Sequence, residues 1–294
     1  MDPCQPRPGH GPCPSAHVSS SPRRWAECQP NKAVLEALDT ADRPMSYQQA
    51  VAARPSDRGQ WSNRFADACA LVGSDALRRS LRALGASNEL IVYPERGGRR
   101  ERPVRLGEGS QKRVDVAVVH PYGGLRIDVT LKGMNFANYG HNLTGRTYEF
   151  EAEMQEVRRL QPACYLFAIF FVPLPGADDH VPSSFAKTVV HLRKRVRMSL
   201  VGVPRPPDRL DGAAVALYAP VDVPLSGGEV VRRGVVRCFD VGAPDAPNEP
   251  PQRGRPEVSS TVAIGGLFDR WTTRYLEEAG GGRPQWANQE VDLP

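Results

Sequence analysis

Two aspartates and a lysine lie in one predicted strand hairpin. The stretch RVDVAVVHPYGGLRIDVTLKG covers residues 113–133, and its centre, His120-Pro121-Tyr122-Gly123, predicts a tight turn. Asp115 lies on the first strand, and Asp128 and Lys132 lie on the second, among valines and leucines. A carboxylate in such surroundings costs free energy unless it is paired or binds a cation. This set therefore favours a Mg²⁺ (or Mn²⁺) site, with the lysine orienting or deprotonating an attacking water or stabilising charge on a phosphorane.

The segments around the hairpin predict the elements that hold it. Apolar spacing predicts one helix over about 57–72 and a second that begins at Ser74 and ends at Gly85. ELIVYPE is a predicted strand, residues 96–110 a mobile basic loop, and TYEFEAEMQEVRRL a helix that begins at Thr144. ACYLFAIFFVPL is apolar throughout, which predicts a strand buried on both faces. The order is helix, three strands, helix, strand, helix, so we predict an α/β (α+β) fold with a mixed sheet.

Glycine and proline divide the chain into predicted segments. The 294 residues include 27 Gly and 28 Pro, many of them near the two ends. Bulky apolar residues are scarce there, so we expect disordered Pro/Gly-rich termini. The predicted segments are a disordered tail over 1–45, a folded domain over 46–240, a Pro-rich linker over 241–256, and a C-terminal helix and tail over 257–294.

The hairpin and the element order together resemble the PD-(D/E)XK nuclease superfamily, the fold of many restriction endonucleases. The family core is αβββαβ, and residues 74–173 follow that order. Asp115 lies where the first motif aspartate is expected, and IDVTLKG lies where the acid-x-lysine strand is expected. The resemblance implies a Mg²⁺-dependent DNA endonuclease of the type II restriction kind. It also implies double-stranded DNA as substrate, a homodimer, and a cognate DNA methyltransferase encoded nearby.

The sequence departs from this motif at one position, and two interpretations follow. Thr130, not an acid, stands two residues before Lys132, and Asp128 stands four before it. In the first interpretation the turn pairs residue 119 with 124, so Asp115 faces Asp128 and both hold the metal. Lys132 is then about 13 Å along the strand. In the second, the register is longer, Thr130 and Lys132 fill the motif positions, and the missing acid comes from elsewhere.

The following helix offers that missing acid. Glu149 and Glu153 are four residues apart and share one helix face, and Glu149 is nearer the start of the helix. Some members of the family carry a relocated glutamate on this helix, so Glu149 is the predicted third ligand beside Asp115 and Asp128. A third outcome is the same fold with an incomplete site, which would bind DNA without hydrolysing it.

Basic residues suggest how DNA would be held. The net charge is +5 and the pI about 9.0, with arginine as the main basic residue. HLRKRVRM places Arg193, Lys194, Arg195 and Arg197 at the end of a predicted helix, and RGGRRERPVR lies in the loop before the hairpin. A metal-dependent phosphoesterase of small molecules is a competing hypothesis that these basic stretches disfavour. No apolar run of 18 residues and no secretory signal occur, so a cytoplasmic protein without a membrane partner is expected.

Overall fold

The structure is a computed structural model that describes most of the chain. The described residues are 24–86, 88–95, 102–107, 110–122, 124–134, 139–176, 183–196, 209–225, 227–243, 246 and 254–278. The α-helices are α1 (Lys32–Asp42), α2 (Tyr47–Ala52), α3 (Pro55–Ala83), α4 (Tyr139–Leu160), α5 (Ser184–Arg193) and α6 (Ile264–Glu278). The strands are β1 (Ile91–Tyr93), β2 (Arg102–Gly107), β3 (Ser110–Val114), β4 (Val116–His120), β5 (Gly124–Gly133), β6 (Tyr165–Pro173), β7 (Gly212–Tyr218), β8 (Val223–Pro224), β9 (Val230–Val231) and β10 (Val236–Asp240).

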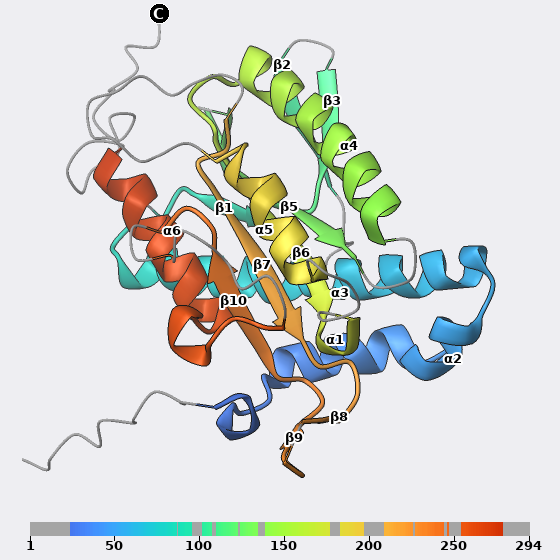
Figure 1. Ribbon diagram of the computed structural model, residues 1–294. Coiled ribbons are helices and arrows are strands. Elements are labelled where there is room, and N and C mark those ends of the chain that lie inside the picture. Colours follow the sequence, from blue (N-terminus) through green and yellow to red (C-terminus); the bar gives the residue numbers. More distant parts are fainter. Residues whose placement is uncertain are drawn as a thin grey trace, which may run out of the picture.

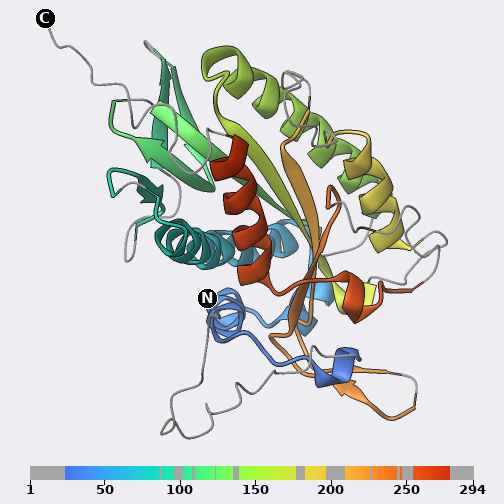
Figure 2. The same cartoon turned by 90° about the vertical axis from the view of Figure 1, so that its left-hand side faces the viewer.

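A six-stranded mixed sheet forms the centre, in the order β1-β4-β5-β6-β7-β10. The pairs β1–β4, β4–β5 and β7–β10 are antiparallel, and β5–β6 and β6–β7 are parallel. Helices α3 and α6 cover one face and α4 and α5 the other (Figures 1 and 2). Every residue of β6 and β7 is buried, as two covered faces require. The predicted mixed α/β class is confirmed.

The two helices predicted over 57–85 form one helix, α3. Ser74, the predicted start of the second helix, is buried in its interior, where its hydroxyl donates to the Leu71 carbonyl (3.0 Å). Gly73 also lies inside α3. A Cβ on Gly73 would come within 3.3 Å of Phe268 of α6 and of Val116 of β4. The glycine therefore lets α6 and β4 approach closely, rather than ending a helix.

The predicted basic loop 96–110 contains strand structure. β2 and β3 pair in a separate antiparallel hairpin outside the main sheet (Figure 1). The chain then bends at Asp115 and continues as β4, so RVDVAVVH is two strands rather than one. The bend places Asp115 at the junction of the two sheets.

The segments before and after the predicted central domain both pack into the hydrophobic core. Residues 24–45 were assigned to a disordered tail with a short helix predicted over 31–40; that helix is α1, whose buried side chains include Val34 and Leu38 in the core shared with α3, so this part of the tail is folded. In α6, Trp271 stacks on Phe167 of β6, with ring centroids 4.6 Å apart and planes inclined by 10°. The C-terminal helix is therefore part of the main core. Among the described helices, none has the length and apolar character needed to cross a bilayer.

Candidate functional site

The register of β4 and β5 decides which predicted residues can meet. His120 pairs with Gly124 and Val119 with Leu125, and an irregularity then shifts the ladder so that Ala117 pairs with Asp128. The first interpretation, with Asp115 facing Asp128, is therefore wrong. The predicted pairing joined residues 119 and 124, whereas Gly124 pairs with His120, so the turn is one residue shorter. The bulge between Val118 and Val119 then shifts the pairing of β4 with β5 by one more residue. Asp115 is thereby placed beside the end of β5, as the second interpretation requires.

Asp115 is anchored at the end of β5 by the backbone. The Leu131 N–H donates to Asp115 Oδ2 at 2.7 Å. Burial raises the pKa of the Asp115 carboxyl to about 6, although the Leu131 N–H and the Lys132 ammonium oppose the shift. Asp128 and Glu153 add to the rise by like-charge repulsion. A carboxylate that is costly to ionise gains most from a nearby cation.

Lys132 interacts electrostatically with Asp115 and forms an ion pair with helix α4. Its Nζ lies 3.2 Å from Glu153 Oε1, and the two side chains are 13% and 34% exposed. Glu149, the predicted ligand, lies one turn before Glu153 on α4. Its Oε2 is 2.8 Å from Arg146 Nη1, and both side chains of this pair are about half exposed. The structure therefore brings Asp115, Lys132 and Glu153 together and leaves Glu149 outside that group.

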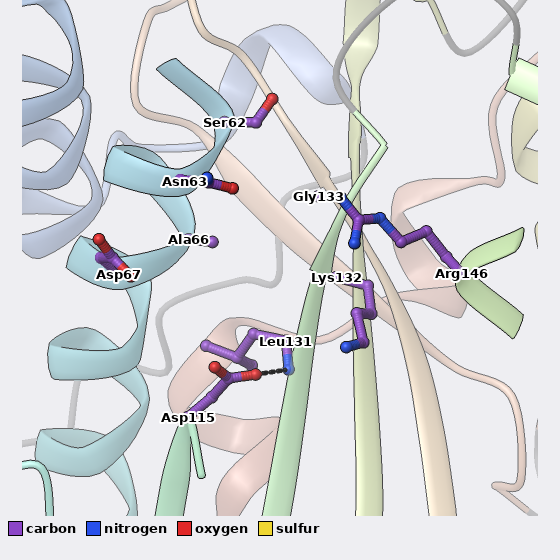
Figure 3. A pocket seen from close by; sticks show the side chains of 9 residues that line it. All are labelled: Ser62, Asn63, Ala66, Asp67, Asp115, Leu131, Lys132, Gly133 and Arg146. Atoms are coloured by element: carbon purple, nitrogen blue, oxygen red, sulfur yellow. Dashed lines mark hydrogen bonds between the residues drawn. The ribbon is translucent and has the colours of Figure 1, made fainter. Parts of the chain in front are cut away.

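Asp115 and Lys132 border a pocket of about 480 Å³ between α3 and the end of β5, and Glu153 is not among the residues that line it. Asp115, Leu131 and Lys132 form one wall, with Arg146 reaching in from α4 (Figure 3). The opposite wall is a polar face of α3. Its members are Ser62, Asn63, Ala66 and Asp67. The sequence analysis missed this wall because it followed the apolar stripe of α3, whereas the polar residues at 62, 63 and 67 on the other face could have revealed it.

Asp128 lies apart from the pocket in a buried ion pair. Its Oδ2 is 3.0 Å from Lys112 Nζ of β3, with side chains 3% and 10% exposed. Its Oδ1 is buried and has no hydrogen-bond partner among the described residues. Burial raises the pKa of Asp128, and Lys112 opposes that rise. Burial also disfavours the Lys112 ammonium, but Asp128 outweighs this effect and raises the pKa of Lys112.

The basic group predicted to bind DNA lies at the end of α5, beside α4. Arg195 Nε is 2.6 Å from Glu151 Oε1 of α4, and Arg195 Nη1 donates to the His191 carbonyl. Lys194 is exposed and Arg193 half-buried. Arg197 lies outside the described residues. Part of this positive charge is therefore already compensated by an acid of the neighbouring helix.

The pocket lining includes the carboxylates of Asp67 and Asp115. In the described part of the chain, no three or more His, Cys, Asp and Glu side chains gather as a metal-binding group. Mg²⁺ nevertheless binds commonly through one or two carboxylates together with waters and substrate phosphates. Asp115 lines the pocket, and Glu153, which pairs with Lys132, interacts electrostatically with Asp115 without being part of the pocket lining. Asp67, on the α3 wall, is a further carboxylate that lines the same pocket.

Comparison of the chain with protein-family models, curated proteins and solved structures gave no match. The interpretation of the pocket therefore rests on its own geometry and on the residue types that line it.

Proposed function

We propose that this protein is a Mg²⁺-dependent DNA endonuclease that hydrolyses phosphodiester bonds at the pocket between α3 and β5. The observation that carries the proposal is the meeting of Asp115, Lys132 and Glu153 at the end of one strand. The PD-(D/E)XK resemblance supports it. The element order α3, β1, β4, β5, α4, β6, with the β2–β3 hairpin inserted, is compatible with an αβββαβ core, and Thr130 stands where the family acid is expected. Glu153 would then take the role that was predicted for Glu149.

The charges that line the pocket also support a phosphate ligand together with a cation. Asp67 and Asp115 balance Lys132 and Arg146, so the wall is neutral when all four are ionised. Asp115 and Glu153 would hold the divalent ion, which would supply positive charge to the phosphate and acidify a bound water. Lys132 and Arg146 would contact the phosphate oxygens and stabilise the negative charge that builds up on them.

A DNA-binding protein with an incomplete site is the second candidate function. The observation that favours it is the small number of carboxylates, because Thr130 replaces an acid and Asp128 is occupied by Lys112. Such a protein would use the basic end of α5 to bind the DNA backbone. Its binding would depend on salt concentration and would be the same with or without Mg²⁺.

The test is a digest of plasmid and phage DNA by the purified protein, with Mg²⁺ or with EDTA, on both methylated and unmethylated substrates. Discrete Mg²⁺-dependent bands support a sequence-specific endonuclease. A salt-sensitive gel shift in both conditions, with no cleavage of either substrate, would favour the binding protein. The same gels, run with a range of protein concentrations and with analytical ultracentrifugation in parallel, test the proposed homodimer.

A further inference from the structure

Lysine is rare in this chain, yet two lysines lie at this site. Of the 38 Lys and Arg residues, five are lysines, at positions 32, 112, 132, 187 and 194. The Lys112 ammonium lies 3.0 Å from the Asp128 carboxylate of β5. The Lys132 ammonium lies 3.2 Å from the Glu153 carboxylate of α4. A lysine ammonium is a compact point charge, whereas a guanidinium is a broad fork that requires several acceptors. Because each ammonium is compact, its electrostatic effect depends on which carboxylate it pairs with.

The two pairs lie close enough to compete. Asp128 and Lys132 are four residues apart on β5, and strand alternation places them on the same face of the sheet. Asp128 interacts electrostatically with Lys132 and Glu153 as well as with Lys112. An unpaired buried carboxylate is costly, so Asp128 without Lys112 would attract the nearest other cation. Besides Lys112, the cation that acts electrostatically on Asp128 is Lys132, whose flexible side chain starts about 13 Å along the strand.

We infer that Lys112 is a positioning residue: by neutralising Asp128 it keeps the Lys132 ammonium directed toward Glu153 and the pocket. Lys112 itself is absent from the residues that line the pocket, so it acts through Asp128. It belongs to the β2–β3 hairpin, and Asp115 follows three residues later. This short segment thus supplies Asp115 to the pocket and, through Lys112 and Asp128, the charge that directs Lys132.

The placement of Lys132 can be measured without any enzymatic activity. In protein labelled with ¹³C-lysine, five side-chain Cε signals are expected, and the Lys132→Arg variant identifies that of Lys132. Lys112→Met should shift the Lys132 signal, because its ammonium moves toward Asp128. The double variant Lys112→Met with Asp128→Asn should return the signal to its wild-type position, because the competing charge is gone. Lys112→Gln, which keeps a donor and removes only the charge, replaces Lys112→Met if the latter does not fold.

The consequence for cleavage rests on the proposed nuclease function. Lys112→Met should lower kcat by about 10-fold or more with little change in KM, since a reacting group is misplaced. The double variant should recover most of that loss. Arg113→Met, an exposed neighbour on the same strand, is the matched control and should change neither the signal nor the rate.

Three results would overturn this inference. One is an unchanged Lys132 signal in both Lys112 variants. The second is a shift that the double variant does not reverse, which would mean that Lys112 only anchors the hairpin. The third is an equal shift in Arg113→Met. If the wild-type protein cleaves no DNA, the nuclease proposal fails, and the lysine signals still decide whether Lys112 positions Lys132.

Discussion

Two of the ion pairs of helix α4 lie at opposite ends of the parallel strands, and they differ in exposure. At the start of β6 and β7, Arg158 of α4 lies 2.6 Å from Asp211, with side chains 5% and 0% exposed. Asp211 also accepts from the Leu166 N–H, and Arg158 donates to the Cys164 carbonyl. At the end of β5, Glu153 of the same helix meets Lys132 beside an open pocket.

The difference shows what each pair can do. The Arg158–Asp211 pair is closed off and shares its hydrogen bonds with the backbone, so it fixes how α4 sits on the sheet. The Lys132–Glu153 pair is next to a desolvated carboxyl, Asp115, whose pKa is raised to about 6. Perturbed groups in a polar cleft are typical of functional sites. One end of the sheet is therefore structural, and we assign the chemistry to the other.

The largest effect on cleavage is expected when residues that line the pocket are removed. Asp115→Ala and Lys132→Ala should each abolish Mg²⁺-dependent cleavage, a loss of more than about 1000-fold, because each removes a group that acts on the reacting phosphate or its cation. Plasmid cleavage rates and thermal melts measure the two effects. Full activity in a folded Asp115→Ala protein would contradict the site assignment.

The buried pair predicts the opposite effect. Asp211→Ala leaves the Arg158 guanidinium without its carboxylate, so we expect the free energy of unfolding to fall by about 3–5 kcal/mol. Urea denaturation measures the loss. Below the midpoint of unfolding, the Mg²⁺ concentration for half-maximal cleavage should match that of the wild type. A stable Asp211→Ala protein with altered Mg²⁺ dependence would show that both ends of α4 serve the site.

Two glutamates on one helix face sharpen the comparison further. Glu153→Gln should weaken Mg²⁺ activation by at least about 10-fold, since it removes a carboxylate oxygen donor next to Lys132. Glu149→Gln is the comparison variant, and we expect a smaller effect on Mg²⁺ activation because Glu149 pairs with Arg146 rather than with Lys132. Mg²⁺ titrations of the cleavage rate compare the two. A larger effect at Glu149 would restore the ligand predicted from the sequence.

The smallest expected effect concerns pH. Asp115 has a pKa of about 6 in the folded protein against 3.8 ordinarily, so folding favours its neutral form. Its contribution to stability, compared with Asp115→Asn, is therefore greatest below about pH 4 and is lost as the pH rises through about 6. Mg²⁺ should restore stability above that pH. Melting temperatures at about pH 5 and about pH 7.5, with and without Mg²⁺, measure this, and a Mg²⁺ shift of equal size at both would contradict it.

The sequence was sufficient for those parts of the fold that depend on local patterns. The apolar run of β6, the alternation in β5 and the amphipathic helix α4 predicted a mixed α/β protein. The helix start predicted at Ser74 was wrong because Ser74 is buried inside α3, which only the tertiary structure shows. The β2–β3 hairpin was missed because its sequence is rich in arginine and glycine and shows no apolar alternation.

The candidate site was predictable in residue types but not in pairing. Asp115 and Lys132 follow from the residues of strands β4 and β5 and their junction, and a relocated helix acid is what the family resemblance implies once Thr130 replaces the motif acid. The choice between Glu149 and Glu153 depends on how α4 lies against β5, and the position of Asp115 along β5 depends on a bulge between Val118 and Val119. Bulges have weak sequence signals because they depend on contacts with neighbouring elements. Lys112 was unrecognised as the partner of Asp128 for the same reason, since it lies on the missed hairpin.

The most direct test of the central claim is calorimetric titration of Mg²⁺ into the protein without DNA, comparing the wild type with Asp115→Asn and Glu149→Gln. We predict saturable binding in the wild type and in Glu149→Gln, and its loss in Asp115→Asn, with melting curves that show all three proteins folded. Equal binding in all three, or none in the wild type, would contradict a cation site at the end of β5.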